Sequence, residues 1–405
     1  MFKNESAIKS NKKWVAVIIA LLAGGGFFLL TSRGSLPGTG LPSASPSIAP
    51  VTAAGSRSFA ITEDGSLWGW GRNSFGQSEN DAIISQGESI NIMNNVAAVY
   101  ANSRTIMVIA SDGTLWSIGA QIQGLRNWIF RSVVFISNND PSFSYNPVQI
   151  MNNVVTVSIS NHEWSHAMAI TSDGGLWGWG YNRFGQLGIS TTEDSRRRPV
   201  RVMDDVIAVS TDNHHTFAIT SDGTLWGWGY NRFGQLGDGT TEDRHQPVKI
   251  MDDVIAVCRT VAITSNGTLW GWGDANLNRF GSDDDVIRNK PIKIMEDVVS
   301  VSSGGTFTFA ITSDRGLWGW GDNRYGQLGD NTMENRHTPV RIMDDVVAVS
   351  AGSVHTLAIT SDGILWAWGN NQFGQLGDGT AENHHSPVKI MDGIHTPNVS
   401  KGQVR

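Results

Sequence analysis

A pattern of four short hydrophobic segments recurs along most of this chain. In residues 206–251 the segments read VIAVS, TFAIT, LWGWG and PVKIM, in that order. The first two are apolar and β-branched, which is typical of strands buried on both faces, whereas LWGWG alternates so that its two tryptophans share one face. An S-D-G turn between the second and third segments favours a tight hairpin, because glycine tolerates positive φ. The unit therefore predicts four consecutive antiparallel strands.

The unit occurs seven times. Its Leu-Trp pair begins at Leu67, Leu115, Leu176, Leu225, Leu269, Leu317 and Leu365, at spacings of 48, 61, 49, 44, 48 and 48 residues. Four short strands at this period are typical of a propeller blade. We therefore predict an all-β fold, a seven-bladed β-propeller of four-stranded blades over residues 51–394, with a C-terminal tail at residues 395–405. If each blade begins with its inner strand, the ring closes without strand exchange; a clasp from residues 394–400 is the alternative.

The N-terminal 50 residues differ in composition. Residues 1–13 are polar and basic, residues 14–30 form an apolar run of 17 residues, and residues 33–50 are rich in Ser, Pro and Gly. The run predicts a transmembrane helix, a signal anchor, over residues 14–32. The four lysines before it place residues 1–13 in the cytoplasm and the propeller outside the cell membrane. A cleaved signal peptide, which would make the protein secreted, is the alternative. Residues 33–50 are predicted to be a disordered linker.

The charge restricts the class of partner. The chain carries a net charge of -7 and its first 50 residues carry +4, which leaves -11 for the rest. An acidic body is a poor match for phosphate backbones, whose binding depends on clustered Lys and Arg, so we expect no nucleic-acid partner. Cys258 is the only cysteine, so the fold has no internal disulfide.

The longest motif of the unit resembles that of a known family. The pattern [S/T]-D-G-x-L-W-G-W-G-x-N-x-x-G-Q-L-G, followed by P-V-x-[I/V], is similar to the regulator of chromosome condensation repeat. The resemblance covers about residues 51–391. It is strongest in the four segments of the type N-R-F-G-Q-L-G, which begin at Asn182, Asn231, Asn323 and Asn371. It implies a seven-bladed β-propeller, here of a bacterial-type exported kind. The family's nucleotide exchange on a nuclear GTPase is not expected of an exported, acidic protein.

Blade 2 departs most from the pattern, because a long aromatic insertion at residues 120–146 replaces its motif. The loops after the first and third strands of every blade should lie on one rim, which makes that rim the better candidate for binding. We expect a binding site there because exposed aromatic side chains are frequent binding anchors. The alternative is that the insertion covers a degenerate blade. The candidate residues are Trp128, Phe130, Phe135, Phe143 and Tyr145, with Trp164 of the next blade.

The repeated tryptophans have a different expected role. Since they stand at the same offset in nearly every blade, we expect them to pack between blades as scaffold. They are Trp68, Trp70, Trp177, Trp179, Trp226, Trp228, Trp270, Trp272, Trp318, Trp320, Trp366 and Trp368.

Repeated polar residues also raise the question of metal sites. Equivalent positions on different blades are expected to lie too far apart to share one ion, so we expect the repeated histidines to form structural hydrogen bonds. The acidic segments 237–243 and 283–285 lack the spacing of a twelve-residue calcium loop and are expected to be exposed charge. We therefore expect no metal and no cofactor. The histidines are His166, His215, His355, His245, His337 and His385.

No nucleophile, base and orienting residue can be assembled from the spacing, so we assign no catalytic residue. We expect a non-catalytic scaffold, membrane-anchored or secreted, that binds a protein or cell-surface partner through one rim and has a monomeric ectodomain. One alternative is an extracellular hydrolase or lyase that acts on cell-wall polysaccharide. Others are a secreted inhibitor resembling the β-lactamase-inhibiting propellers and a structural surface-layer component.

Overall fold

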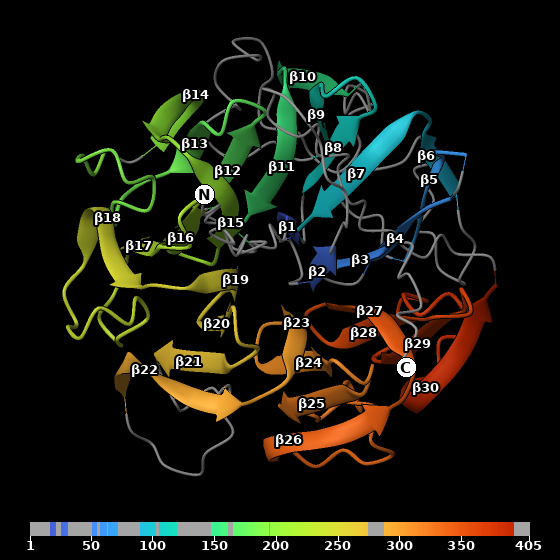
Figure 1. Cartoon of the computed structure of the whole chain (residues 1–405). Coiled ribbons are helices and arrows are strands. Elements are labelled where there is room, and N and C mark those ends of the chain that lie inside the picture. Colours follow the sequence, from blue (N-terminus) through green and yellow to red (C-terminus); the bar gives the residue numbers. More distant parts are fainter. Residues whose placement is uncertain are drawn as a thin grey trace, which may run out of the picture.

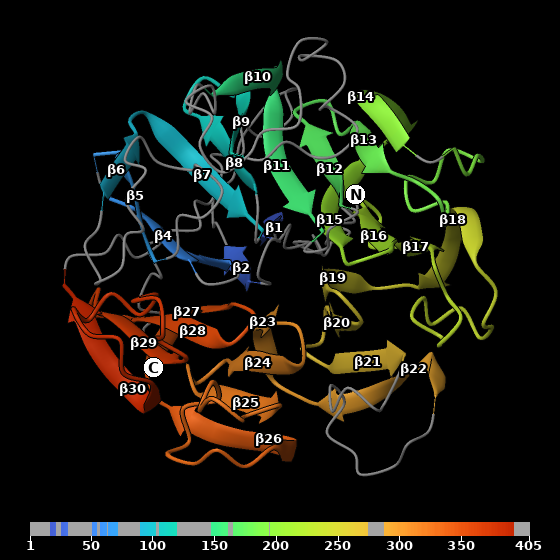
Figure 2. The same ribbon diagram turned by 180° about the vertical axis from the view of Figure 1, so that it is seen from behind.

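The computed structural model arranges seven four-stranded sheets in a ring, seen from its two sides in Figures 1 and 2. Each sheet is an antiparallel meander of consecutive strands, with its first strand near the centre and its fourth at the periphery. The predicted all-β, seven-bladed propeller is therefore confirmed. The structure describes residues 17–21, 26–30, 51–54, 57–62, 64–71, 90–102, 105–119, 147–160, 165–193, 195–273 and 287–392.

Blades 1 to 3 differ mainly in the length of their outer strands. Blade 1 contains β3 (Val51–Ala54), β4 (Arg57–Ile61), β5 (Leu67–Gly71) and β6 (Ile90–Met93). Blade 2 contains β7 (Val96–Ala101), β8 (Thr105–Ala110), β9 (Leu115–Gly119) and β10 (Val148–Met151). Blade 3 contains β11 (Val154–Ile159), β12 (His166–Thr171), β13 (Leu176–Tyr181) and β14 (Ser195–Met203).

Blades 4, 6 and 7 are closely similar to one another, whereas the first two strands of blade 5 are shorter. Blade 4 contains β15 (Val206–Thr211), β16 (His215–Thr220), β17 (Leu225–Gly229) and β18 (Arg244–Met251). Blade 5 contains β19 (Val254–Cys258), β20 (Val261–Thr264), β21 (Leu269–Gly273) and β22 (Arg288–Met295). Blade 6 contains β23 (Val298–Ser303), β24 (Phe307–Thr312), β25 (Leu317–Gly321) and β26 (Arg336–Met343). Blade 7 contains β27 (Val346–Ala351), β28 (His355–Thr360), β29 (Leu365–Gly369) and β30 (His384–Met391).

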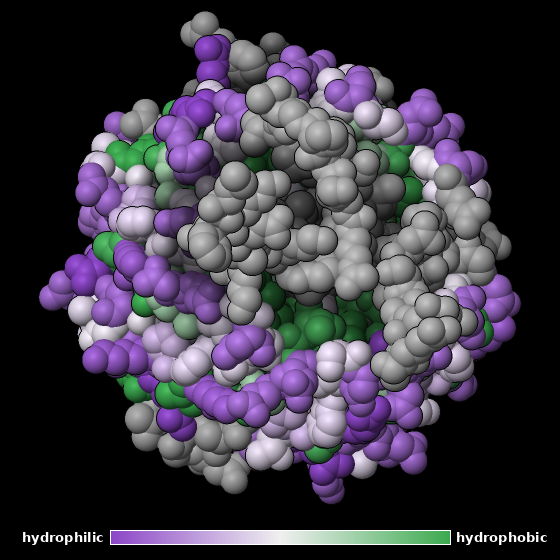
Figure 3. Space-filling view, in the orientation of Figure 1, coloured by the Kyte–Doolittle hydropathy of each residue, from purple (hydrophilic) through white to green (hydrophobic). Residues whose placement is uncertain are grey.

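Burial follows the position of each strand within its blade. The second strands are buried almost throughout, because neighbouring blades cover both faces, and β28 is buried at all six positions. The outer strands, such as β30, are partly or fully exposed along their length. On the face seen in Figure 3 the periphery is largely hydrophilic, and hydrophobic residues gather around the centre of the ring. The core of the propeller therefore lies in the packing between blades.

Two kinds of turn meet on one rim. Gly223 in the S-D-G turn of blade 4 has a φ of 83°, and Asp253 at the start of blade 5 has a φ of 64°. Asn and Asp tolerate this left-handed region better than most residues, which explains the repeated M-D-D and M-N-N segments. Val254 N donates to Gly223 O at 2.9 Å, and Ser265 N donates to Asp253 O at 2.9 Å. The first bond joins blade 5 to blade 4, and the second lies within blade 5. Because these turns occupy one rim, the opposite rim carries the loops after the first and third strands.

In the part of the chain that the structure describes, the ring closes between blade 7 and blade 1 without exchange of a strand, because each of these two sheets consists of four consecutive strands. Trp70 Nε1 and Ser58 Oγ of blade 1 donate to Gln375 O of blade 7 at 3.1 and 2.7 Å. Ala53 N donates to Ser350 Oγ at 3.0 Å. Side-chain packing and hydrogen bonds thus join the two ends of the ring. The alternative clasp, residues 394–400, lies outside the described residues.

A separate two-stranded sheet lies near the centre of the ring. It pairs β1 (Val17–Leu21) with β2 (Gly26–Leu30) in antiparallel register. β1 lies against the inner strands β11, β15 and β19, and β2 lies against β23 and β27 (Figure 1). The transmembrane helix predicted over residues 14–32 is therefore not confirmed. In the part of the chain that the structure describes, no helix is long and apolar enough to cross a bilayer.

Candidate functional site

The G-Q-L-G segment of one blade holds the indole ring of the next. Trp228 Nε1 of blade 4 donates to Gln186 O of blade 3 at 2.9 Å, and Thr216 Oγ1 donates to the same oxygen at 2.8 Å. Gly188 has a φ of 73°, and a Cβ there would lie 2.8 Å from Trp228 Nε1, so a larger residue would not fit. G-Q-L-G is therefore a joint between blades. The same bond recurs in Trp272–Gln235, Trp368–Gln327 and Trp70–Gln375, at 2.8, 2.9 and 3.1 Å.

The two tryptophans of each L-W-G-W-G strand have different surroundings. Trp228 is fully buried between blades, whereas Trp226 is partly exposed and donates from Nε1 to Thr220 Oγ1 at 3.2 Å. The first tryptophan lies closer to the S-D-G rim, where a long side chain of the outer strand covers it; in blade 3 the Arg201 guanidinium lies 5.7 Å from the Trp177 ring. The second tryptophans, buried, are Trp70, Trp179, Trp228, Trp272, Trp320 and Trp368. The first, partly exposed, are Trp68, Trp177, Trp226, Trp270, Trp318 and Trp366.

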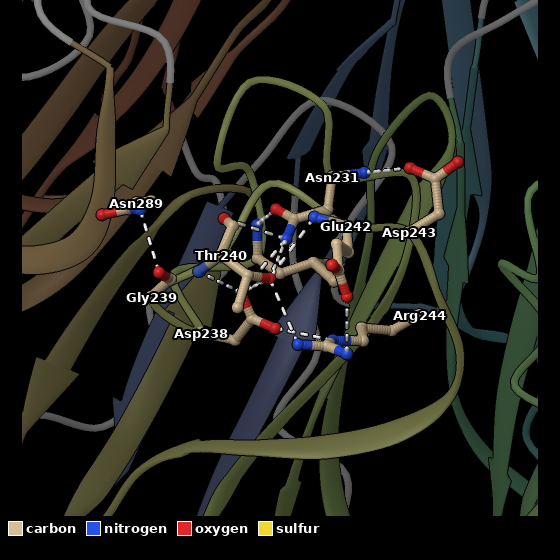
Figure 4. A network of polar contacts seen from close by, with 9 residues as sticks. Asn231, Asp238, Gly239, Thr240, Glu242, Asp243, Arg244 and Asn289 are labelled. Carbon is tan, nitrogen blue, oxygen red and sulfur yellow. Dashed lines mark hydrogen bonds and ion pairs between the residues drawn. The ribbon is translucent and has the colours of Figure 1, made fainter.

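A polar network makes the loop after the third strand rigid (Figure 4). In blade 4, Leu236 N donates to Asn231 Oδ1 at 2.9 Å, and Asn231 Nδ2 donates to Asp238 Oδ1 at 3.1 Å. Asp238 also accepts from Thr240 N at 2.9 Å and from Arg244 Nε at 2.7 Å. The bonds from the Asn side chain recur at Asn323 and Asn371. A rigid loop positions its exposed side chains at little entropic cost.

This network corrects one prediction about the acidic segment 237–243. Asp238 is not an exposed charge, because its side chain is only 5% exposed and pairs with Arg244. Partial burial raises the pKa of Asp238, but hydrogen bonds from Thr240 and Arg244 outweigh it and hold that pKa below its usual value. Glu242, with a side chain 78% exposed, does lie on the surface. The other acidic segment, 283–285, lies outside the described residues.

Two of the repeated histidines, His166 and His355, form side-chain hydrogen bonds across blade boundaries. Because Thr216 Oγ1 donates to Gln186 O, it accepts from His166 Nε2, which lies 2.8 Å away. His355 Nε2 lies 3.1 Å from Ser58 Oγ in the equivalent arrangement between blades 7 and 1. Burial, followed by the nearby His214 and His215, lowers the pKa of His166 to about 3. Within the described residues, no group of three or more His, Cys, Asp or Glu side chains is placed to hold a metal ion.

The rim that carries the loops after the first and third strands holds a cluster of aromatic rings in blades 3 and 4. The Phe184 ring centroid lies 4.9 Å from that of His214 and 5.1 Å from that of Tyr230. Tyr181 lies 6.3 Å from Phe184, and Phe233 lies 6.2 Å from Tyr230. All five side chains are at least partly exposed, and Phe233 is 45% exposed. We call these five residues the aromatic rim cluster.

Arg259 of blade 5 fixes the loop that carries His214. It follows β19 in a loop shorter than its counterparts, and its guanidinium pairs with Asp212, two residues before His214. Its Nη1 donates to Gly304 O of blade 6 at 2.9 Å, and its backbone N donates to Ser210 Oγ at 2.9 Å. The Arg259 and Asp212 side chains are 11% and 5% exposed, so solvent screens this ion pair little. The irregular blade 5 thus supports the rim of blade 4.

The binding residues predicted from the sequence are a different set, and all six lie outside the described residues. In the sequence, however, residues 120–146 follow β9 and Trp164 follows β11, and both of these strands end at the rim of the aromatic cluster. No motif in the sequence pointed directly to that cluster. The cluster could have been found by comparing the residue before the motif asparagine among blades. This residue is Tyr181 in blade 3 and Tyr230 in blade 4, but Asp322 in blade 6 and Asn370 in blade 7.

The fold and its joints define a seven-bladed β-propeller built from one repeated blade. The regulator of chromosome condensation (RCC1) repeat matches residues 173–219, 222–259, 266–311, 316–359 and 362–401, which is more than half of the chain. A second description of the same repeat matches residues 52–77, 206–235, 298–327 and 346–375. The chain belongs to the RCC1 repeat family.

Similar proteins share the repeat over part of their length. The ultraviolet-B receptor UVR8 of Arabidopsis thaliana is 29% identical over 156 residues, which are 38% of this chain and 33% of UVR8. The guanine nucleotide exchange factor SRM1 of Saccharomyces cerevisiae is 26% identical over 165 residues, 36% of this chain and 32% of SRM1. The matches thus span about a third of each relative. The crystal structure of human WBSCR16 has the same fold, with a TM-score of 0.63 at 22% identity, over 82% of this chain and 92% of that one.

Proposed function

We propose that this protein is a non-catalytic scaffold that binds a protein partner through the rim of blades 3 and 4. The observation that carries the proposal is the aromatic rim cluster, in which rings contact one another and remain accessible. Tyr and Arg are enriched among the residues that dominate binding energy, and Arg232 lies 6.0 Å from the Tyr230 ring in this cluster. A rigid ring that displays loops suits recognition. The names of the curated relatives, a receptor and an exchange factor, also favour an interaction role.

Capture with matched variants tests this proposal. The full chain, in mild detergent, is used to capture proteins from cell extract beside a Phe184→Ala/Tyr230→Ala variant. Tyr325→Ala is the control, because Tyr325 is 39% exposed at the position equivalent to Phe184 but two blades beyond blade 4. We expect the wild type and the control to recover the same protein and the double variant to recover about tenfold less or lower. Equal recovery by all three would refute binding through this cluster.

We also propose that the aromatic insertion of blade 2 extends this binding surface. The support is topological, because β9 and β11, which come before the insertion and Trp164 in the sequence, end at the same rim. Removal of residues 120–146 should weaken capture and leave the melting temperature nearly unchanged. A large drop in melting temperature would instead assign the insertion to covering blade 2.

For location, we propose a membrane-anchored protein with a monomeric propeller outside the cell, or a secreted one if residues 14–32 are cleaved. The apolar run and the lysines before it support this orientation. An anchored chain should stay in the membrane pellet after alkaline carbonate washing and lose its propeller to protease added outside the cells. Release by carbonate with an intact N-terminus would contradict the anchor and favour the β1–β2 hairpin as part of the soluble ring.

A further inference from the structure

Two arginines stand beside the aromatic rim cluster without an acidic partner. Arg183 of blade 3 and Arg232 of blade 4 are exposed, and neither forms an ion pair with any described residue. Acidic groups are not scarce, since the chain carries 37 Asp and Glu against 30 Lys and Arg. Most other arginines of the described residues do pair with a carboxylate. These are Arg201, Arg244, Arg259, Arg315, Arg324, Arg336 and Arg341.

Blade 6 shows how the repeat neutralises the same arginine. There Arg324 stands at the position equivalent to Arg183 and Arg232, and Asp322 takes the place of the tyrosine. Arg324 Nε and Nη2 donate to the two Asp322 carboxylate oxygens, each at 2.9 Å. In blades 3 and 4 the tyrosine removes that carboxylate and adds a ring. The guanidinium groups of Arg183 and Arg232 can therefore donate hydrogen bonds to a carboxylate of a bound molecule.

We propose that this surface binds an acidic segment of a protein partner, in which Asp or Glu alternates with aromatic or aliphatic residues. The inference rests on the proposed function and specifies the partner's chemistry. A guanidinium donates two parallel hydrogen bonds to a carboxylate, and the rings beside Arg183 and Arg232 offer apolar contact for the intervening side chains. Elsewhere the acidic surface of the propeller repels such a segment, so charge complementarity directs it to blades 3 and 4.

Charge also argues against a nucleic acid as the occupant. Binding to a phosphate backbone depends on many clustered Lys and Arg. Apart from Arg196, Arg197 and Arg198 at the start of β14, the loops after the third strands of blades 3 and 4 contribute one arginine each, no lysine and five acidic residues, Glu193, Asp194, Asp238, Glu242 and Asp243. Two guanidinium groups between aromatic rings match a short acidic and apolar segment better than a long polyanion.

Selection from a random peptide display library tests the proposal. The full-length protein in mild detergent is the bait, and an Arg183→Gln/Arg232→Gln variant, which keeps the length and polarity of both side chains, is used for counter-selection. We expect selected peptides to carry Asp or Glu beside aromatic or aliphatic residues. Synthetic copies with Gln or Asn in place of the acids should bind about tenfold more weakly or worse, as should the original peptides to the double variant. Raising NaCl from about 0.05 to about 0.5 M should weaken the wild-type complex.

Three results would overturn the proposal. One is selected peptides without an acidic excess, and another is binding that the Arg183→Gln/Arg232→Gln variant retains in full. The third is wild-type self-association in sedimentation velocity that this variant loses, which would make a second copy of the chain the occupant. The Phe184→Ala/Tyr230→Ala variant distinguishes failure of the acidic-segment proposal from failure of the proposed binding rim. If neutral peptides bind and need these rings, only the acidic chemistry fails; if peptides bind without them, the proposed rim fails as well.

Discussion

One backbone oxygen in each complete blade determines how two blades meet. The Gln186 carbonyl accepts from both Trp228 Nε1 and Thr216 Oγ1, and the threonine hydroxyl in turn accepts from His166. Every polar atom of this chain of contacts is buried between blades 3 and 4, where a missing partner would cost about 1–3 kcal/mol. The repeated Trp, Gln, Thr and His residues are therefore parts of one joint.

The joint predicts unequal roles for the two tryptophans of a strand. Trp228→Ala should lower the free energy of unfolding by about 3–5 kcal/mol, because it leaves a cavity between blades and removes one of the two hydrogen bonds to the Gln186 carbonyl. Trp226→Ala is the matched control. It removes a partly exposed ring, so we expect a loss of about 1 kcal/mol. Urea denaturation followed by far-ultraviolet circular dichroism measures both, and equal losses would contradict the assignment of the second tryptophan to the joint.

His166 predicts how stability depends on pH. The folded-state pKa is about 3, against an ordinary value of 6.5. Between these values the unfolded chain binds a proton that the folded chain excludes, so the stability contributed by neutral His166 is present above pH 6.5 and is lost as pH falls. His166→Gln cannot titrate, so its urea midpoint should fall less than that of the wild type between about pH 7 and about pH 5. Identical falls would show that His166 is not the group responsible.

At the scale of elements, the closure of the ring can be tested with two glycines of one loop. Gly377 and Gly379 have nearly equal φ values of 78° and 79°, but a Cβ on Gly377 would lie 2.7 Å from Trp70 Nε1, whereas one on Gly379 would meet nothing within 4 Å. Both alanine variants carry the left-handed backbone cost of about 1–2 kcal/mol. Gly377→Ala should lose about 1–3 kcal/mol more, because it also pushes blade 1 away from blade 7. Equal melting temperatures would mean that this joint does not close the ring.

The strands and their turns could be predicted because their determinants are local. Runs such as VIAVS and the S-D-G turns report burial and backbone conformation within a few residues. Blade 6 follows the same turn even though Arg315, with a φ of 65°, stands in the glycine position. The acceptor in each joint was not predictable in this way, because a backbone carbonyl such as Gln375 O has no side-chain signature and its partner Trp70 is 305 residues away.

The candidate site was harder to predict for the same reason. Tyr181 and Phe184 look like ordinary members of a repeat, and the contact of Phe184 with His214 exists only because blades 3 and 4 lie side by side. Unusual residues outside the repeat, such as Trp128, attract notice in a sequence, whereas a cluster built from repeated positions does not. Comparison of equivalent positions among blades, Tyr230 against Asp322 for example, supplies the missing signal.

At the scale of the whole molecule, the ring presents two rims of different chemistry. The S-D-G rim repeats Asp side chains in almost every blade and joins neighbouring blades through backbone bonds such as Val254 N to Gly223 O. The opposite rim varies from blade to blade. On blades 3 and 4 it gathers aromatic rings together with Arg183 and Arg232, which form no ion pair with any described residue. A partner that binds at one specific place on the ring must distinguish one blade from the others, so we expect it to bind the rim opposite the S-D-G turns.

Photo-cross-linking within cells can test whether a partner binds through the rim of blades 3 and 4. A photoreactive amino acid is placed at Phe233, 45% exposed in the aromatic rim cluster, or at Asp222, exposed in the S-D-G turn of the same blade. Because both sites lie on blade 4, expression and folding are matched. We expect a cross-linked partner from position 233 and none from position 222. A partner cross-linked from position 222 alone, or equally from both, would contradict binding through the rim of blades 3 and 4.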